Sequence, residues 1–138
     1  MINSLLKIPY KLHGNDENGL DCFTMLIFVL EKLTGTLMVD YNELPEYDKN
    51  YRVTNPSAFL DEIKKHCEVF EKSFSECSQI LQINDILLFD LAGLGIVDHG
   101  GIYLGNNKFL HCEQERGVCL HKLSMLSSHF VGYARLRR

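Results

Sequence analysis

Residues 19–35 read GLDCFTMLIFVLEKLTG, and this stretch sets the expected architecture. Apolar side chains at positions 23, 26, 27, 30 and 33 recur at helical spacing, and positions 25, 28 and 29 add apolar surface on other sides. Asp21 is a suitable N-cap and Gly35 a suitable C-terminal stop. The pattern predicts a buried helix over residues 22–34 at the centre of one half of the protein.

A second helix is predicted over residues 56–67. Asn55 can cap it, Pro56 suits its first position, and an apolar stripe follows at positions 59, 60 and 63. Between the two helices, residues 37–51 are poorly periodic and rich in tyrosine and acidic residues. We expect this segment to form either a lid over a cleft or a docking surface.

The second half of the chain changes character. Short β-rich runs separated by Gly and Asn turns occupy residues 86–89, 96–104, 108–113, 117–121 and 130–136. Helices first and antiparallel strands second predict an α+β fold, with a mainly antiparallel sheet packed on a helical half. A cleft is expected where the halves meet.

Composition excludes several classes of protein. With 138 residues, 46% hydrophobic and 23% charged, the chain fits one folded domain over residues 1–138 rather than a disordered tail. A net charge of −4 argues against nucleic acid as the main partner. The longest apolar run, residues 25–30, is too short for a membrane span. The first twelve residues lack the features of a secretory signal, so we expect synthesis in the cytoplasm.

Five cysteines with no Cys-x-x-Cys pair indicate reduced thiols rather than a disulfide scaffold or a zinc ribbon. A metal site built from His111, Cys112, Cys119 and His121 is conceivable. Its spacing matches no standard zinc pattern, so neither a metal nor another cofactor is expected.

Cys22 is a candidate nucleophile because it lies at the start of the predicted buried helix. Backbone N–H groups and the helix dipole favour an anion there, which lowers the pKa of a thiol. Without further partners, the alternative is a cysteine that acts as a small buried hydrophobic residue.

His99 and His111 lie in two predicted strands joined by residues 105–107. A three-residue loop, or a bulge with the same effect, would place both rings on one face of the sheet as diagonal neighbours. A two-residue loop alone would send them to opposite faces, because side chains alternate along a strand. The alternative is that each histidine is only a surface or packing residue.

Several fragments together carry a resemblance. Residues 9–10 (PY), 19–22 (GLDC), 84–89 (NDILLF), 99–105 (HGGIYLG) and 109–112 (FLHC) followed by 117–118 (GV) occur in the order typical of one family. Nearly the whole chain, from Ile8 to Arg138, resembles the NlpC-type (NlpC/p60) cell-wall cysteine peptidases, a papain-like family.

The resemblance implies a role for each matching residue. Cys22 would be the nucleophile, His99 the general base, and His111 the third residue that orients the His99 ring. Tyr10 would stabilise the oxyanion together with the Cys22 backbone N–H. The Asp21–Phe23 surroundings would form part of the substrate site, with Phe23 in place of the serine that many members have. The implied substrates are the stem peptides of peptidoglycan.

An aromatic residue after Asp-Cys, the Gly35 helix stop and the segment 131–135 (VGYAR) resemble members associated with phage tails. The expected setting is therefore a virion tail tip whose peptidase opens the cell wall and contacts other tail-tip proteins. Two alternatives remain open at this stage. One is a tail-assembly or structural protein with little activity, and the other is a thiol amidase or acyltransferase on a similar scaffold.

Overall fold

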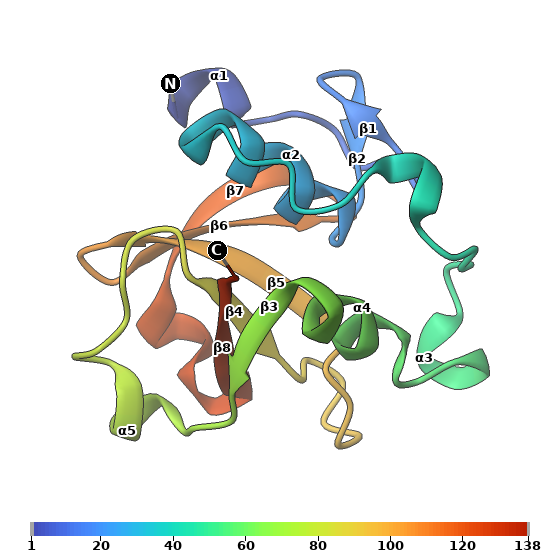
Figure 1. The fold of residues 1–138 in the computed structure, drawn as a ribbon. Coiled ribbons are helices and arrows are strands. Elements are labelled where there is room, and N and C mark those ends of the chain that lie inside the picture. Colours follow the sequence, from blue (N-terminus) through green and yellow to red (C-terminus); the bar gives the residue numbers. More distant parts are fainter. Residues whose placement is uncertain (1, 138) are drawn as a thin grey trace.

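A six-stranded antiparallel sheet organises the protein, with strand order β3-β8-β4-β5-β6-β7 in the computed structural model, which describes residues 2–137 (Figure 1). Strands β4 to β7 are consecutive neighbours in the sheet, whereas β8 pairs with both β3 and β4 and so brings distant segments together. The strands are β3 (Cys67–Phe70), β4 (Ile86–Phe89), β5 (His99–Gly105), β6 (Lys108–Glu113), β7 (Gly117–Lys122) and β8 (Phe130–Leu136). The expected α+β class is confirmed.

Helix α2 (Thr24–Thr34) is the predicted central helix, and its first seven residues are all buried. It ends at Gly35 in the left-handed conformation, whose N–H donates to the Glu31 carbonyl, as the glycine predicts. The start differs from the prediction by two residues. Asp21 accepts the N–H groups of Phe23 and Thr24, so Cys22 lies in the capping turn and the helix proper follows it.

Helix α4 (Ala58–His66) replaces the predicted helix over residues 56–67. Its start is shifted because residues 55–58 form a tight turn, in which the Ala58 N–H donates to the Asn55 carbonyl. Several short elements were not predicted, because each is too short to show a periodicity. They are α1 (Ile2–Leu5), β1 (Asn15–Asp16), β2 (Gly19–Leu20), η1 (Tyr41–Glu43), α3 (Tyr51–Thr54), β3, α5 (Phe74–Cys77) and η2 (Leu123–His129).

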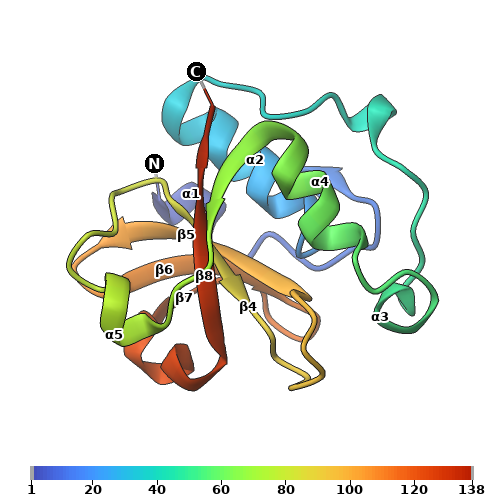
Figure 2. The same ribbon diagram turned by 60° about the horizontal axis from the view of Figure 1, so that its bottom comes forward.

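The sheet has an apolar cluster on each face. On one face, α2 and α4 cover alternate strand residues such as Ile86, Leu88 and Ile102. On the other, α5 and η2 cover a second set that includes Leu87, Phe89 and Phe109. Figure 2 shows the two longer helices and α5 on opposite sides of the strands. Burial on both faces explains why β4 reads as a continuous apolar run.

The β5–β6 hairpin combines a two-residue turn with a β-bulge, and the two together decide on which faces His99 and His111 lie. Asn106 and Asn107 form a two-residue turn, both with positive φ. A bulge at Leu104 then shifts the register by one residue, so that Ile102 pairs with Leu110. This is the register that a three-residue loop would produce, and here a two-residue turn with a bulge produces it. Both histidines therefore lie on the same face.

Strand β5 begins at His99 rather than at residue 96. The buried carboxylate of Asp98 accepts the N–H groups of Leu91 and Ala92, which holds residues 90–98 in a loop.

No helix within residues 2–137 combines the length and the apolar character that crossing a bilayer requires.

The N-terminal segment is fastened to β7 through Gly117. Val118 N–H donates to the Ile8 carbonyl, and Lys7 N–H donates to the Val118 carbonyl. Gly117 has a φ of 72°, and an added Cβ would lie 2.1 Å from the Ile8 carbonyl oxygen. Only glycine allows this approach, which leads the chain toward Tyr10.

The substitution Gly117→Ala tests this junction. We expect it to lower the free energy of unfolding by about 3 kcal/mol or more, from a left-handed backbone (about 1–2 kcal/mol) plus a backbone overlap. Gly35→Ala is the matched control, since Gly35 also has positive φ but has no neighbouring atom within 4 Å of the added Cβ. Urea unfolding should show Gly117→Ala to be clearly the more damaging of the two, and equal losses would contradict the steric argument.

Candidate active site

Cys22 is held in the turn between β2 and α2 by the carboxylate of Asp21. That carboxylate is 1% exposed and accepts from Phe23 N–H (2.9 Å) and Thr24 N–H (2.8 Å) through one oxygen. Its other oxygen accepts from His13 N–H (2.9 Å) and from the Tyr47 hydroxyl. Both oxygens of Asp21 are thus engaged by the protein, and the residue acts here as a cap that positions Cys22.

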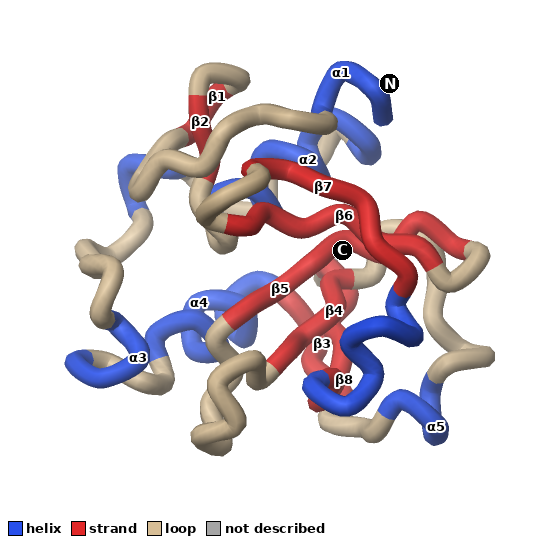
Figure 3. Tube along the Cα trace, turned by 180° about the vertical axis from the view of Figure 1, so that it is seen from behind, coloured by secondary structure: helices blue, strands red, loops and turns tan. Residues whose placement is uncertain are grey.

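The segment between α2 and α4 forms one wall around Cys22. Tyr51 Oη lies 3.8 Å from Cys22 Sγ and donates to the Asp98 carbonyl oxygen at 2.6 Å. Tyr47, whose ring centroid lies 6.2 Å from that of Tyr51, donates to the carboxylate of Asp21. Figure 3 shows this segment running along one side of the molecule from α2 past α3 to α4. Of the two expectations for residues 37–51, the contacts favour a lid beside the thiol.

His99 enters the same region as the first residue of β5. It is 5% exposed and follows Asp98, whose carbonyl receives the Tyr51 hydroxyl. The phenol of Tyr51 therefore connects the thiol of Cys22 with the strand that carries His99. Phe89, on the neighbouring strand, packs against the ring at a centroid distance of 6.0 Å.

Three imidazoles form a hydrogen-bonded series across β5, β6 and β7. His99 Nε2 lies 2.8 Å from His111 Nδ1, and His111 Nε2 lies 2.6 Å from His121 Nδ1. The prediction that His111 points to the ring of His99 is confirmed. The sequence suggested His121 only as one member of a conceivable metal site, and the structure places it against the far nitrogen of His111.

His111 is neutral at physiological pH. Burial, reinforced by the nearby His99, lowers its pKa from 6.5 to about 3, against the opposing attraction of Glu113. A neutral ring can accept a hydrogen bond at Nδ1 from His99 Nε2–H when its own proton is on Nε2. His111 is therefore suited to orienting the ring of His99.

Tyr10 lies beside Cys22 and Asp21 at the N-terminal edge of the site. Burial, together with the nearby charges of Cys22 and Asp21, raises the pKa of Tyr10 to about 12. A hydrogen bond with Gln114 opposes this effect only in part. The Tyr10 hydroxyl therefore keeps its proton and is available as a donor. Tyr10 forms an isolated β-bridge with Leu20, which comes two residues before Cys22 in the chain.

A cleft of about 330 Å³ brings the candidate residues together. Tyr10, Asp21, Cys22, His99 and His111 all line it, although they come from four separate parts of the chain. The remaining walls include Tyr47 and Tyr51 from the lid segment, Leu91 from the loop before β5, and Glu113 and Gln114 at the end of β6.

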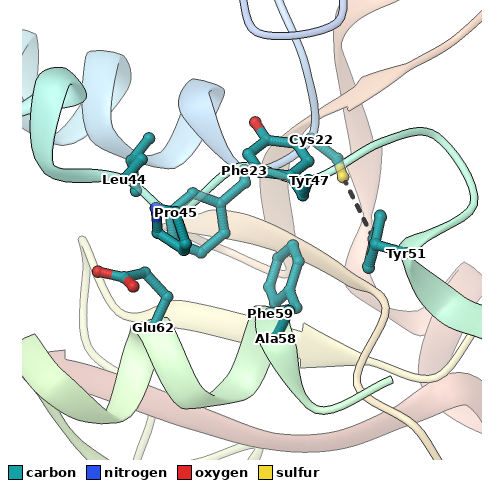
Figure 4. Close-up of a pocket in the computed structure, with 9 residues that line it drawn as sticks. All are labelled: Cys22, Phe23, Leu44, Pro45, Tyr47, Tyr51, Ala58, Phe59 and Glu62. Atoms are coloured by element: carbon teal, nitrogen blue, oxygen red, sulfur yellow. Dashed lines mark hydrogen bonds between the residues drawn. The ribbon is translucent and has the colours of Figure 1, made fainter. Parts of the chain in front are cut away.

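Phe23 faces a different hollow beside Cys22, shown in Figure 4. Its ring packs edge-on against Phe59 at a centroid distance of 5.1 Å, and Leu44 and Pro45 close the other side. The remaining space is about 30 Å³, room for little more than a water molecule. Phe23 therefore limits the size of any group bound next to the thiol on this side.

The other four cysteines differ from Cys22 in their surroundings. Burial raises the pKa of Cys67 to about 11 and that of Cys112 and Cys119 to about 12, and it also raises the pKa of Cys77. These four thiols stay protonated at neutral pH.

Tyr47, Tyr51 and His121 are the site residues that sequence reasoning missed. Tyr47 and Tyr51 lie in a segment without periodicity, and nothing local predicts that it returns to the cleft. His121 could have been found from the register of β6 and β7, in which Phe109 pairs with His121 and His111 with Cys119.

Comparison with solved structures shows the same fold in several proteins. The NlpC/p60 domain of the peptidoglycan hydrolase SagA matches with a TM-score of 0.57 at 16% identity, covering 99% of this chain and 92% of that one. A lipoprotein-like NLP/P60 family protein from Staphylococcus aureus matches with a TM-score of 0.61 at 22% identity, over 97% of this chain and 38% of that one. NlpC2 from Trichomonas vaginalis matches with a TM-score of 0.61 at 17% identity, over 98% and 44%.

The chain thus spans nearly all of the crystallised SagA domain but less than half of the other two solved chains. The likeness establishes the papain-like α+β fold. No curated protein matches the sequence. The sequence profile of the NlpC/P60 family, however, matches residues 7–135, which include both the capped turn of Cys22 and the histidine-bearing hairpin. The chain belongs to the NlpC/P60 family.

Proposed function

We propose that this protein is a cysteine peptidase that hydrolyses amide bonds in peptidoglycan stem peptides. The observation that carries the proposal is the convergence of Cys22, His99 and His111 on one cleft, with His99 Nε2 at 2.8 Å from His111 Nδ1. A nucleophile, a base and a group that orients the base are the parts that thiol-dependent acyl transfer needs.

In the proposed reaction, Cys22 gives its proton to His99 at Nδ1, the ring nitrogen that does not contact His111. The thiolate attacks the scissile carbonyl carbon, and the C–N bond breaks as the His99 imidazolium returns the proton to the leaving amine. A water molecule, deprotonated by His99, then hydrolyses the thioester and regenerates the thiol.

His111 supports the imidazolium without exchanging a proton with the substrate. In the tautomer that this role requires, its Nδ1 accepts from His99 Nε2–H and its own Nε2–H donates to His121 Nδ1, across distances of 2.8 and 2.6 Å. The lowered pKa of His111 keeps it neutral, so that it does not compete with His99 for the proton.

The Tyr10 hydroxyl and the Cys22 backbone N–H are the proposed donors to the oxyanion. Tyr10 keeps its proton because its pKa is raised to about 12. A donor fixed before the reaction stabilises the developing charge without a reorganisation cost. Asp21 contributes indirectly, by fixing the turn from which Cys22 projects.

The substrate class comes from the family and from a structural relative. SagA, whose NlpC/p60 domain shares the fold, is a peptidoglycan hydrolase. The cleft of about 330 Å³ is lined by both hydrogen-bonding and apolar side chains, the two kinds of group that orient a ligand and give it contact area. We extend the proposal to a role at the tip of a phage tail, which the sequence resemblance of residues 131–135 favours. Detection of the chain in purified virions by mass spectrometry would test that setting.

Digestion of purified peptidoglycan tests the proposed activity. The intact protein should release stem-peptide fragments with new amino termini, and Cys22→Ala should release none. Mass spectrometry of the soluble fragments identifies the bond that is cut. If the two proteins release the same fragments, or if the folded intact protein releases nothing from any wall type, the proposal fails in favour of a structural role.

Selective alkylation tests the special status of Cys22. Only thiolates react rapidly, and the raised pKa values of the other four cysteines keep them protonated near pH 7. Brief iodoacetamide treatment followed by peptide mapping should label Cys22 first. Of the others, the partly exposed Cys119 should begin to react only as the pH rises toward its pKa of about 12, and the three buried cysteines should stay unlabelled in the folded protein. Labelling of any of the four before Cys22 would contradict the assignment.

The two histidines should differ in their effect on turnover. His99→Ala should reduce kcat/KM by the roughly 10²–10⁴-fold typical of general acid–base catalysis, or more. His111→Asn should be milder, because an amide oxygen can still accept from His99 Nε2–H, whereas His111→Ala removes the acceptor.

The pH dependence separates the roles further. Since the pKa of His111 lies near 3, its protonation lies outside the pH 5–8 range, and His111→Asn should leave the acidic limb of the profile where it is. Thermal melting should accompany these measurements. A dead His111→Ala beside an active His99→Ala, at equal stability, would reverse the assignment.

A further inference from the structure

Four side chains with metal-binding atoms occupy one face of the β6–β7 ribbon. His111 pairs directly with Cys119 across the two strands. Glu113 lies two residues beyond His111, and His121 two residues beyond Cys119, so alternation places all four on the same face. Their ligand atoms all lie within 4.8 Å of one another.

This set differs from the one considered from sequence alone. Cys112 belongs to the opposite face of β6, where its thiol donates to the Leu20 carbonyl oxygen at 3.2 Å. Glu113 takes its place in the cluster. The arrangement depends on strand pairing and therefore shows none of the loop spacings that reveal zinc sites in a sequence.

We propose that His111 Nε2, Glu113, Cys119 Sγ and His121 Nδ1 form a binding site for Zn²⁺ or a similar borderline-soft divalent cation. Two imidazoles, a thiolate and a carboxylate are all established ligand types for zinc.

The separations come close to those of a tetrahedral site. Zinc bonds of about 2.0–2.3 Å imply ligand-to-ligand edges of about 3.3–3.6 Å. His111 Nε2 lies 2.6 Å from His121 Nδ1 and 4.0 Å from Glu113 Oε2, and Cys119 Sγ lies 3.5 Å from Glu113 Oε1. Binding requires the two imidazoles to move apart by less than 1 Å. It also releases the Cys119 proton to solvent.

Arg116 is the charge that opposes a cation at this place. Its guanidinium lies 3.5 Å from both Glu113 Oε1 and His121 Nε2. The Arg116 side chain is 68% exposed, so it can turn into solvent when the cation takes over its partner. When the metal ion replaces the Arg116 guanidinium beside Glu113, the negative charge of this carboxylate stays balanced by a cation.

The consequence for catalysis rests on the proposed function. A metal on Nε2 of His111 leaves the imidazole proton on Nδ1, which then donates to Nε2 of His99. The His99 imidazolium carries a proton on that same nitrogen, so the bound ion opposes its formation. The cation would therefore inhibit the peptidase through the orienting histidine, without contact with Cys22.

Cobalt binding to Cys22→Ala protein tests the site itself, because this variant removes the nucleophile as a competing ligand. Co²⁺ should bind one per chain, with a thiolate-to-cobalt charge-transfer band and the visible bands of a tetrahedral ion, and Zn²⁺ should displace it. Adding Cys119→Ser should abolish the charge-transfer band. Adding Glu113→Gln should weaken Co²⁺ binding at least about tenfold. Loss of a residue that only hydrogen-bonds to a metal ligand already costs about tenfold in affinity or more, and Glu113 is itself a proposed ligand. The control is Glu115→Gln, which changes an exposed carboxylate of the same turn and should have no effect.

Inhibition of the active protein tests the coupling. After treatment with a chelator, Cys119→Ala should match the unchanged protein in activity and melting temperature, but it should need at least about tenfold more Zn²⁺ for half-inhibition. No cobalt binding by Cys22→Ala protein, or binding unaffected by Cys119→Ser, would overturn the site. Equal zinc sensitivity with and without Cys119 would overturn the coupling. Cobalt binding by a chain that releases nothing from peptidoglycan would refute the proposed function and leave the site standing.

Discussion

The buried carboxylate of Asp21 is the interaction on which the active-site geometry depends. It accepts the first N–H groups of the central helix, the N–H of His13 from the N-terminal segment and the hydroxyl of Tyr47 from the lid. One anion thereby joins three parts of the chain at the residue before Cys22. A buried carboxylate is stable only when its oxygens are fully hydrogen-bonded, so these three parts must assemble together.

The opposite side of the cleft depends on an irregularity in the sheet. A two-residue turn alone would separate the rings of His99 and His111, and the bulge at Leu104 restores them to one face. The same pairing continues into β7 and adds His121 to the series. The hydrogen-bonded orientation of His99, the proposed base, and the proposed metal site are therefore two consequences of one strand register.

Tyr51 connects the two sides. Its hydroxyl donates to the Asp98 carbonyl and lies 3.8 Å from the thiol, so the lid segment is attached to both the helix half and the sheet half. Together with Phe23 and Phe59, it leaves little space on the apolar side of Cys22, whereas the larger space beside the thiol is the cleft that holds the histidines. The lid thus determines from which side the thiol can be reached.

The sequence by itself determined the elements whose signals are local, because periodicity, caps and turn residues act over a few positions. These elements are the central helix between Asp21 and Gly35 and four of the six main strands within a residue. The roles of the candidate residues came from the resemblance of short motifs to one family. The sequence also showed that His99 and His111 meet if the hairpin register shifts. Only the tertiary structure decided that the shift occurs through a bulge, that Tyr47 and Tyr51 return to the thiol, and that His121 and Glu113 join His111. Those contacts arise from strand pairing and from the path of an aperiodic segment, which depend on distant parts of the chain and leave no pattern among neighbouring residues.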